Sequence, residues 1–234
     1  MKIDKYLKET KILDYSHPAL VALVKKKQWE NLSEYDKIGA IYGFVQNEII
    51  FGYNKSDEIP ASRVLQDGYG QCNTKGTLLM ALFRKVGIAC RFHGFTIDKI
   101  LQKGAITGVL YKIAPNNIIH SWVEIYYQEK WVNLEGFILD KLYLNSLQKK
   151  FPEVQDNFCG YGVATSNFKS PIIDWQGGDT YIQKEGINND YGVFDSPDDF
   201  YEKHGSNLSG LKKLIYSRFV RKLMNSNVAK IRQA

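Results

Sequence analysis

The sequence has few cysteines and no pattern that would pair them. Its three cysteines, Cys72, Cys90 and Cys159, are an odd number and include no C-x-x-C motif. This argues against a disulfide-stabilised scaffold and against a structural zinc site. We therefore expect reduced thiols, no metal site and no cofactor.

Long hydrophobic runs are also absent. Apolar stretches such as Ile118 to Ile119 and the interrupted Val123 to Tyr127 are too short to cross a bilayer. The first residues, MKIDKYLKE, contain no hydrophobic signal region, so we expect a cytoplasmic protein without a transmembrane segment. With 44% hydrophobic residues, 24% charged residues and only six prolines among 234, the composition is that of a globular chain and not of a fibre or a disordered one.

Acidic residues are missing from the last part of the chain. Residues 211–234 contain seven Lys or Arg and no Asp or Glu, although the net charge of the whole chain is only +6. Apolar residues recur there near one helical face, so residues 206–234 are predicted to form a basic amphipathic helix. The preferred interpretation is that this helix packs on its own domain; the alternative is that it binds an acidic partner or an anionic surface, and no nucleic acid is expected as a partner. The apolar face comprises Leu211, Leu214, Ile215, Phe219 and Leu223.

A glycine-rich turn leads into the most informative segment of the chain. Gly68 and Gly70 allow a sharp turn just before Cys72, and Gly87 stands where the C-terminal cap of a helix belongs. The sulfur of Cys72 would then lie beside unpaired amide groups at the positive end of the helix dipole, which favours a nucleophilic thiolate. Taken alone, a small buried cysteine is the simpler interpretation. The apolar residues at helical spacing are Leu78, Leu79, Leu82, Phe83 and Val86.

Two strands joined by a short turn supply a histidine and an acid. Residues 120–127 alternate as a strand and residues 131–135 return antiparallel, which can bring His120 and Glu135 together. With Cys72, these residues make a Cys-His-acid arrangement, which is typical of thiol hydrolases and acyltransferases.

Alternatives exist for two members of this arrangement. His93, on a strand predicted over residues 88–97, is the only rival base, but it lacks the tryptophan and the partner strand that follow His120. Asn133 shares a strand face with Glu135 and is the second choice for the residue that orients the histidine.

Two further side chains have candidate supporting roles. Gln66 lies six residues before Cys72, at the offset of the oxyanion-hole glutamine in papain, although a surface glutamine is the preferred interpretation. The amide of Cys72 itself is the better oxyanion donor, because it needs only the helix start. Trp122 shares a strand face with His120 and is a candidate supporting residue.

Three sequence blocks, which follow one another along the chain around Cys72, His120 and Glu135, resemble the transglutaminase-like superfamily. The core of this superfamily is a variant of the papain fold. This resemblance implies an α+β fold in which a nucleophilic cysteine begins a central helix packed on an antiparallel sheet. One difference is that the family usually has Asp where this chain has Glu135. The blocks are Gly70-Gln-Cys72 with its helix, His120-Ser-Trp-Val-Glu124 and Trp131-Val-Asn-Leu-Glu135.

The resemblance also implies an activity. We expect an enzyme that attacks an amide of a peptide or protein substrate through a Cys72 thioester, as a peptidase or amidase more than as a protein cross-linker. The alternative is a catalytically silent interaction module that binds an acidic partner through the basic helix. Neither the physiological substrate nor the oligomeric state follows from the sequence.

The resemblance ends near residue 140. We predict one transglutaminase-like domain over residues 1–205, with its core at about 35–140 and a loop-rich extension at 141–205, followed by the helix 206–234. Residues 98–117 form an insertion between two predicted strands. It is either a wall or lid of the active-site cleft or a surface excursion.

Overall fold

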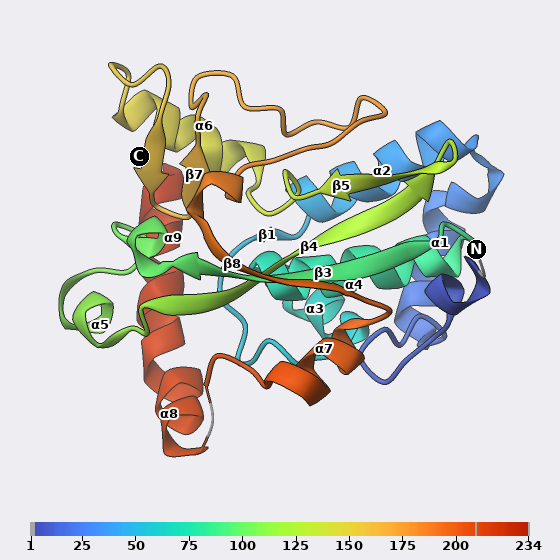
Figure 1. Cartoon of the computed structure of the whole chain (residues 1–234), viewed down its shortest axis with the longest axis horizontal. Coiled ribbons are helices and arrows are strands. Elements are labelled where there is room, and N and C mark those ends of the chain that lie inside the picture. Colours follow the sequence, from blue (N-terminus) through green and yellow to red (C-terminus); the bar gives the residue numbers. More distant parts are fainter. Residues whose placement is uncertain (1–2, 209, 234) are drawn as a thin grey trace.

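The fold is built on an antiparallel sheet of four strands in the order β5-β4-β3-β8, with the helix α4 packed against it (Figure 1). The computed structural model describes residues 3–208 and 210–233. The predicted α+β class, with a central helix on an antiparallel sheet, is confirmed. The strands of this sheet are β3 (Cys90–Asp98), β4 (Asn117–Tyr127), β5 (Lys130–Leu134) and β8 (Ile187–Phe194).

The central helix α4 (Cys72–Lys85) begins at the predicted cysteine. The backbone N–H of Gln71 donates to Thr74 Oγ1 (3.1 Å). The sequence predicts one apolar face, but every side chain from Cys72 to Arg84 is buried. Because β4 packs on one side of α4 and other helices pack around it, even its polar side chains are enclosed.

Helices from the N-terminal third surround α4 and position the turn before Cys72. Two of them begin at capping side chains, since His17 Nδ1 accepts from the N–H of Ala19 and Ser33 Oγ accepts from that of Asp36. A short parallel pair of strands, β1 and β2, holds the turn that precedes Cys72. These elements are α1 (Pro18–Lys27), α2 (Glu34–Asn47), β1 (Ile50–Phe51), α3 (Ala61–Asp67) and β2 (Tyr69–Gly70), with 3-10 turns η1 (Ile3–Leu7) and η2 (Trp29–Asn31).

The predicted hairpin of β4 and β5 forms with a tight turn. Gln128 and Glu129 both have positive φ angles, 48° and 63°, as a two-residue turn of this hand requires. Between β3 and β4, the insertion contains the 3-10 turn η3 (Lys99–Gln102) and the helix α5 (Gly108–Ile113).

The prediction of irregular loops after residue 140 is wrong in two places. Residues 141–150 form a helix that Asp140 caps, and β8 joins the central sheet beside β3. The pattern of β8 is hard to recognise because polar residues fill its middle and its register with β3 shifts twice. The elements of this part are α6 (Lys141–Lys150), β6 (Phe158–Gly160), β7 (Val163–Thr165), η4 (Lys184–Gly186) and α7 (Pro197–His204).

The C-terminal segment is helical, but its buried face differs from the predicted one. It consists of α8 (Gly210–Ile215), the π-helical turn η5 (Tyr216–Val220) and α9 (Arg221–Gln233), which packs on α6. A π turn has more residues than an α turn. It therefore rotates the apolar residues that follow it relative to those that precede it. Met224, Val228 and Ile231 are buried in the main core, whereas Leu214, Ile215, Phe219 and Leu223 are exposed; the side chain of Leu211 lies outside the described residues. Within the described ranges, no helix is long and apolar enough to span a membrane.

Arg232 joins the end of α9 to the start of α6. Its Nη2 donates to Asp140 Oδ2 (2.7 Å) and to the carbonyl of Phe51 (2.9 Å). Burial raises the pKa of Asp140, but hydrogen bonds from Arg232 and from the Phe51 N–H outweigh it and hold that pKa below its usual value. The pair is therefore a buried clamp between the C-terminal helix and the core.

Replacing Arg232 by alanine should destabilise the protein strongly. Arg232→Ala leaves the carboxylate of Asp140 buried without its counter-ion, so we expect the free energy of unfolding to fall by about 3 kcal/mol. The measurement is urea denaturation at neutral pH. Lys230→Ala, at an exposed position of the same helix, is the control and should change stability by less than about 0.5 kcal/mol. Equal losses in the two variants would contradict a clamp role for Arg232.

Candidate active site

Cys72 lies at the first position of α4 and borders a cavity of about 510 Å³. Its side chain is 8% exposed. The side chain of Gln71 accepts from the backbone N–H of Thr74, whereas the N–H groups of Cys72 and Asn73 have no acceptor within the helix. A ligand in the cavity can therefore meet both a thiol and a set of amide donors.

His120 occupies a stretch of β4 that has no partner in β5. The register of the two strands ends at Val123 opposite Leu134, and β4 continues three residues further to His120. Because β5 has ended, Glu135 can turn toward the histidine, and its Oε1 lies 2.8 Å from His120 Nε2. Both side chains are fully buried.

The second carboxylate oxygen of Glu135 is held by the backbone. The N–H groups of Ile182 and Gln183 both donate to Glu135 Oε2 at 2.8 Å, and the backbone N–H of Glu135 donates to the carbonyl of Thr180. The carboxylate therefore cannot rotate away from His120. This anchoring comes from a loop more than forty residues later in the chain.

The charge state of His120 is set by its neighbours. Burial by itself lowers the pKa of His120, but the charge of Cys72 and the hydrogen bond with Glu135 raise it to about 10. With Nε2 bound to Glu135, the free ring nitrogen is Nδ1, which is buried and has no hydrogen-bond partner among the described residues. The raised pKa favours an imidazolium that interacts electrostatically with Cys72, and a neighbouring positive charge stabilises a thiolate.

Two sequence-predicted residues do not reach His120 or Cys72. Asn133 donates through Nδ2 to Tyr181 OH (2.8 Å) and to Asp179 Oδ2 (3.2 Å). Gln66 is exposed on α3 and does not line the cavity. Gln66 lies near the end of α3, directly before Gly68, and its side chain faces solvent. It is therefore not in place to act as an oxyanion donor.

Aromatic rings cover the strand face that carries His120. Trp122 is buried, and its ring centroid lies 4.2 Å from that of Phe95 and 5.6 Å from that of Tyr181. Phe95 stands opposite His120 in the strand register, with ring centroids 6.2 Å apart. These rings leave little room for water near the histidine.

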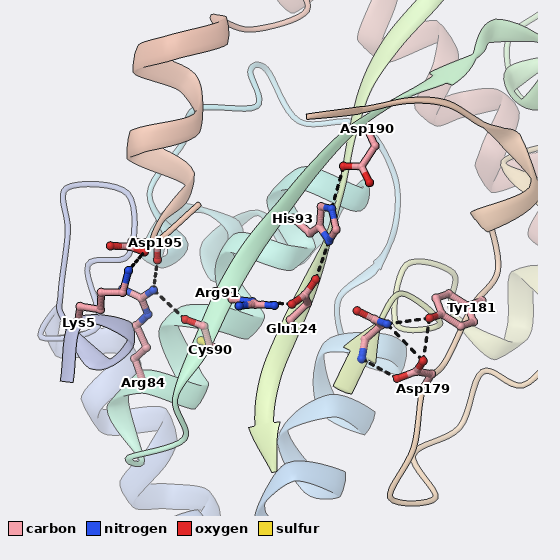
Figure 2. A network of polar contacts seen from close by, with 11 residues as sticks. Lys5, Arg84, Cys90, Arg91, His93, Glu124, Asp179, Tyr181, Asp190 and Asp195 are labelled. Carbon is pink, nitrogen blue, oxygen red and sulfur yellow. Dashed lines mark hydrogen bonds and ion pairs between the residues drawn. The ribbon is translucent and has the colours of Figure 1, made fainter. Parts of the chain in front are cut away.

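His93 belongs to a different polar network (Figure 2). Its Nδ1 faces Glu124 and its Nε2 lies 2.9 Å from Asp190 Oδ1, while Arg91 Nε donates to the other oxygen of Glu124. Burial lowers the pKa of His93, but the two carboxylates outweigh it and raise that pKa. Both ring nitrogens are therefore engaged, and His93 is not positioned as the base for Cys72.

The structure adds a polar cluster beside Cys72 that the sequence did not indicate. Asp57 accepts from Gln71 Nε2 (2.9 Å) and Asn73 Nδ2 (3.3 Å) through one oxygen and from Asn207 Nδ2 (3.0 Å) through the other. In the sequence, the only indication of this cluster is that Gln71 and Asn73 flank Cys72. Asp57 and Asn207 come from distant loops, so no local pattern connects them with Cys72. Among the described residues, no group of three or more His, Cys, Asp or Glu side chains is arranged to hold a metal ion.

A buried lysine was also not expected. Lys75, one turn after Cys72, is fully buried, and its Nζ donates to the carbonyls of Gln46 and Ile138 at 3.0 Å each. Burial lowers the pKa of Lys75 to about 7. The side chain ties the start of α4 to the end of α2 and to the segment that follows Glu135.

The pKa of His120 can be measured directly. We expect imidazole nitrogen shifts in NMR spectra to titrate with a midpoint near pH 10, and Glu135→Gln to lower that midpoint because a carboxylate charge is lost. Since the pKa of folded His120 lies above its ordinary value of 6.5, the corresponding stabilisation is complete below about pH 6.5 and is lost as pH rises through about 10. A midpoint near 6.5 in the unaltered protein would contradict this geometry.

Sequence comparisons identify the family of this region. Residues 22–136 match the model of the transglutaminase-like superfamily. Residues of this chain are 30% identical over 111 positions to YebA, an uncharacterized protein of Bacillus subtilis (strain 168); the match covers 43% of this chain and 15% of YebA. The chain thus spans only a small part of the curated relative that it matches.

Solved structures show two partial similarities. A candidate cysteine protease from Cytophaga hutchinsonii aligns with a TM-score of 0.49 and 13% identity, over 84% of this chain and 48% of that one. Red sea bream transglutaminase aligns with a TM-score of 0.32 and 14% identity, over 57% of this chain and 26% of that one.

The family assignment and the fold agree with each other. The matched residues 22–136 include the helix that Cys72 begins, the strand of His120 and Glu135 itself. The predicted papain-like transglutaminase core is thus confirmed, and residues 22–136 of this chain belong to the transglutaminase-like superfamily.

Proposed function

We propose that this protein is a thiol hydrolase or acyltransferase that acts on an amide carbonyl, with Cys72 as nucleophile, His120 as general base and acid, and Glu135 as the residue that orients the histidine. The observation that carries the proposal is the fully buried hydrogen bond between His120 Nε2 and Glu135 Oε1, on an imidazole whose pKa the charge of Cys72 raises. Superfamily membership supports the same chemistry.

The reaction begins at the sulfur. With the proton of Cys72 already on His120 Nδ1, the thiolate attacks the carbonyl carbon of the substrate. The negative oxygen is stabilised by N–H groups of the first turn of α4, including that of Cys72. When the tetrahedral intermediate collapses, the C–N bond breaks, His120 gives its proton to the leaving amine, and a thioester remains on Cys72.

The second half of the reaction releases the acyl group. His120 removes a proton from water, and the resulting hydroxide attacks the thioester carbonyl. The C–S bond then breaks, and His120 returns the proton to the sulfur of Cys72. The products are a carboxylic acid and free enzyme. An amine in place of water would give a new amide by the same steps.

Glu135 contributes orientation and charge. Its carboxylate keeps His120 with Nε2 bound and Nδ1 free, and it stabilises the imidazolium that forms in each half-reaction. The backbone donors on its other oxygen keep it in place. Glutamate is one methylene longer than the aspartate usual in the family, and the short end of β5 accommodates that length. Retention of all three groups also weighs against a catalytically silent module.

The reactivity of Cys72 tests the nucleophile. We expect iodoacetamide to label Cys72 faster than the fully buried Cys90, and His120→Ala to slow labelling of Cys72 roughly 100-fold, because the imidazolium partner is lost. Peptide mass spectrometry resolves the rates at each cysteine. Labelling of the exposed Cys159 is the internal control and should not change. The nucleophile assignment fails if Cys72 reacts at the same rate in both proteins.

The third member of the triad is tested by two variants. Glu135→Gln should lower kcat/KM for p-nitrophenyl acetate by roughly 10² to 10⁴, because the histidine loses its orienting charge. Asn133→Ala, which removes contacts only with Asp179 and Tyr181, should lower it only slightly. Thermal midpoints of both variants control for unfolding. If Asn133→Ala caused the larger loss, Asn133 would replace Glu135 in the mechanism.

A further inference from the structure

The apolar side chains that enclose most of the cavity at Cys72 come from three separate parts of the chain, and the mainly polar segments 53–57 and 71–73 line the rest. One wall comes from the ends of β3 and β4, a second from the insertion and a third from the C-terminal segment. In Figure 1, α5, α8 and α9 gather at the same end of the sheet. Representative side chains are Ile97 and Ile118 from the strands, Ile106 and Leu110 from the insertion, and Val220 and Met224 from the C-terminal helices.

The insertion is therefore a wall of the cavity and not a plain surface excursion. Its backbone is tied to the C-terminal helix, because Asn227 Nδ2 donates to the carbonyls of Gly104 (2.8 Å) and Ala105 (2.7 Å). The two apolar walls thus hold each other in place. A cavity of about 510 Å³ lies within the range of small-molecule binding sites.

Several polar side chains that line the cavity are hydrogen-bonded among themselves. Lys55, which is exposed, and Lys213, whose Nζ lies 3.4 Å from Glu58 Oε2, also line it. Tyr53 OH donates to Gln102 Oε1 (2.6 Å), and the oxygens of Asp57 accept from Gln71, Asn73 and Asn207. A peptide main chain that entered this space would bring N–H and C=O groups that lose their water and meet few free partners. A hydrocarbon chain has no such requirement, and its burial is favourable.

We propose that the cavity binds the acyl part of the substrate, and that this part is an aliphatic chain. The inference rests on the proposed function, since it places the carbonyl carbon of the chain at Cys72 Sγ. The S–C bond forms there while the C–N or C–O bond to the leaving group breaks. His120 gives its proton to that group, and water later releases the chain as a carboxylic acid. The side chains that select the chain length are Ile106, Leu110 and Met224.

A series of p-nitrophenyl esters tests the proposal on the full chain. With acetate, butyrate, hexanoate and octanoate esters, kcat/KM should rise roughly 10-fold for each two added CH₂ groups until the cavity is full. Subtracting the rate of Cys72→Ala removes hydrolysis that does not use the thiol. Intact-protein mass spectrometry shows whether the acyl group is on the enzyme, and peptide mapping whether it is on Cys72.

Variants that fill the cavity locate the chain. Ile106→Trp should shift the best ester to a shorter chain, and Leu110→Trp, at a less buried position of the same wall, provides a second variant if the first does not fold. The matched control is Leu142→Trp on α6, where the native side chain is 68% exposed and is not part of this cavity. It should leave the chain-length profile unchanged.

The outcomes separate the two proposals. If no ester acylates Cys72, the proposed function itself fails. If every ester acylates Cys72 at a similar rate, or if Ile106→Trp and Leu110→Trp fold but keep the profile of the unaltered protein, the thiol chemistry stands and the aliphatic site is wrong. Faster acylation by a glutamine-containing peptide than by the octanoate ester would also overturn the aliphatic assignment.

Discussion

The site depends on one buried hydrogen bond, between His120 Nε2 and Glu135 Oε1. Neither side chain touches solvent, so His120 Nε2 and the two oxygens of Glu135 depend on each other and on backbone N–H groups for their hydrogen bonds. The bond exists only because β5 stops early and the loop that contains Ile182 and Gln183 returns across the end of the sheet. The irregular segment before η4 is thus as necessary to the geometry as the regular strands.

A buried lysine fixes the start of α4. Lys75 Nζ donates to two carbonyl groups from different parts of the core, and the residue lies one turn from Cys72. Removing an amino group from water has a free-energy cost unless partners replace the water. These two hydrogen bonds therefore favour a single arrangement of α4, the end of α2 and the segment that follows Glu135.

Local patterns predicted the parts of the molecule whose partners are near in sequence. The helix that Cys72 begins and the hairpin of β4 and β5 follow from residues within a few positions of one another. The structure brings Glu135, the first choice for the orienting residue, to His120.

Predictions failed where the deciding contact is distant or the periodicity is broken. Polar residues and two register shifts conceal β8, and the π turn η5 rotates the apolar pattern of the C-terminal helices. The contacts of Asp57 and Asn207 beside the site join segments 150 residues apart, and no local pattern reports such a pair.

The C-terminal helices supply a wall of the cavity as well as the clamp between Arg232 and Asp140. In the order of synthesis, Cys72 leaves the ribosome while more than half of the chain, including α8 and α9, has not yet been made. Until these helices are made, one wall of the cavity is missing, and the apolar side chains of the other walls lack the residues that cover them. The cavity beside Cys72 is therefore completed only after α9 has been synthesised and has packed on α6.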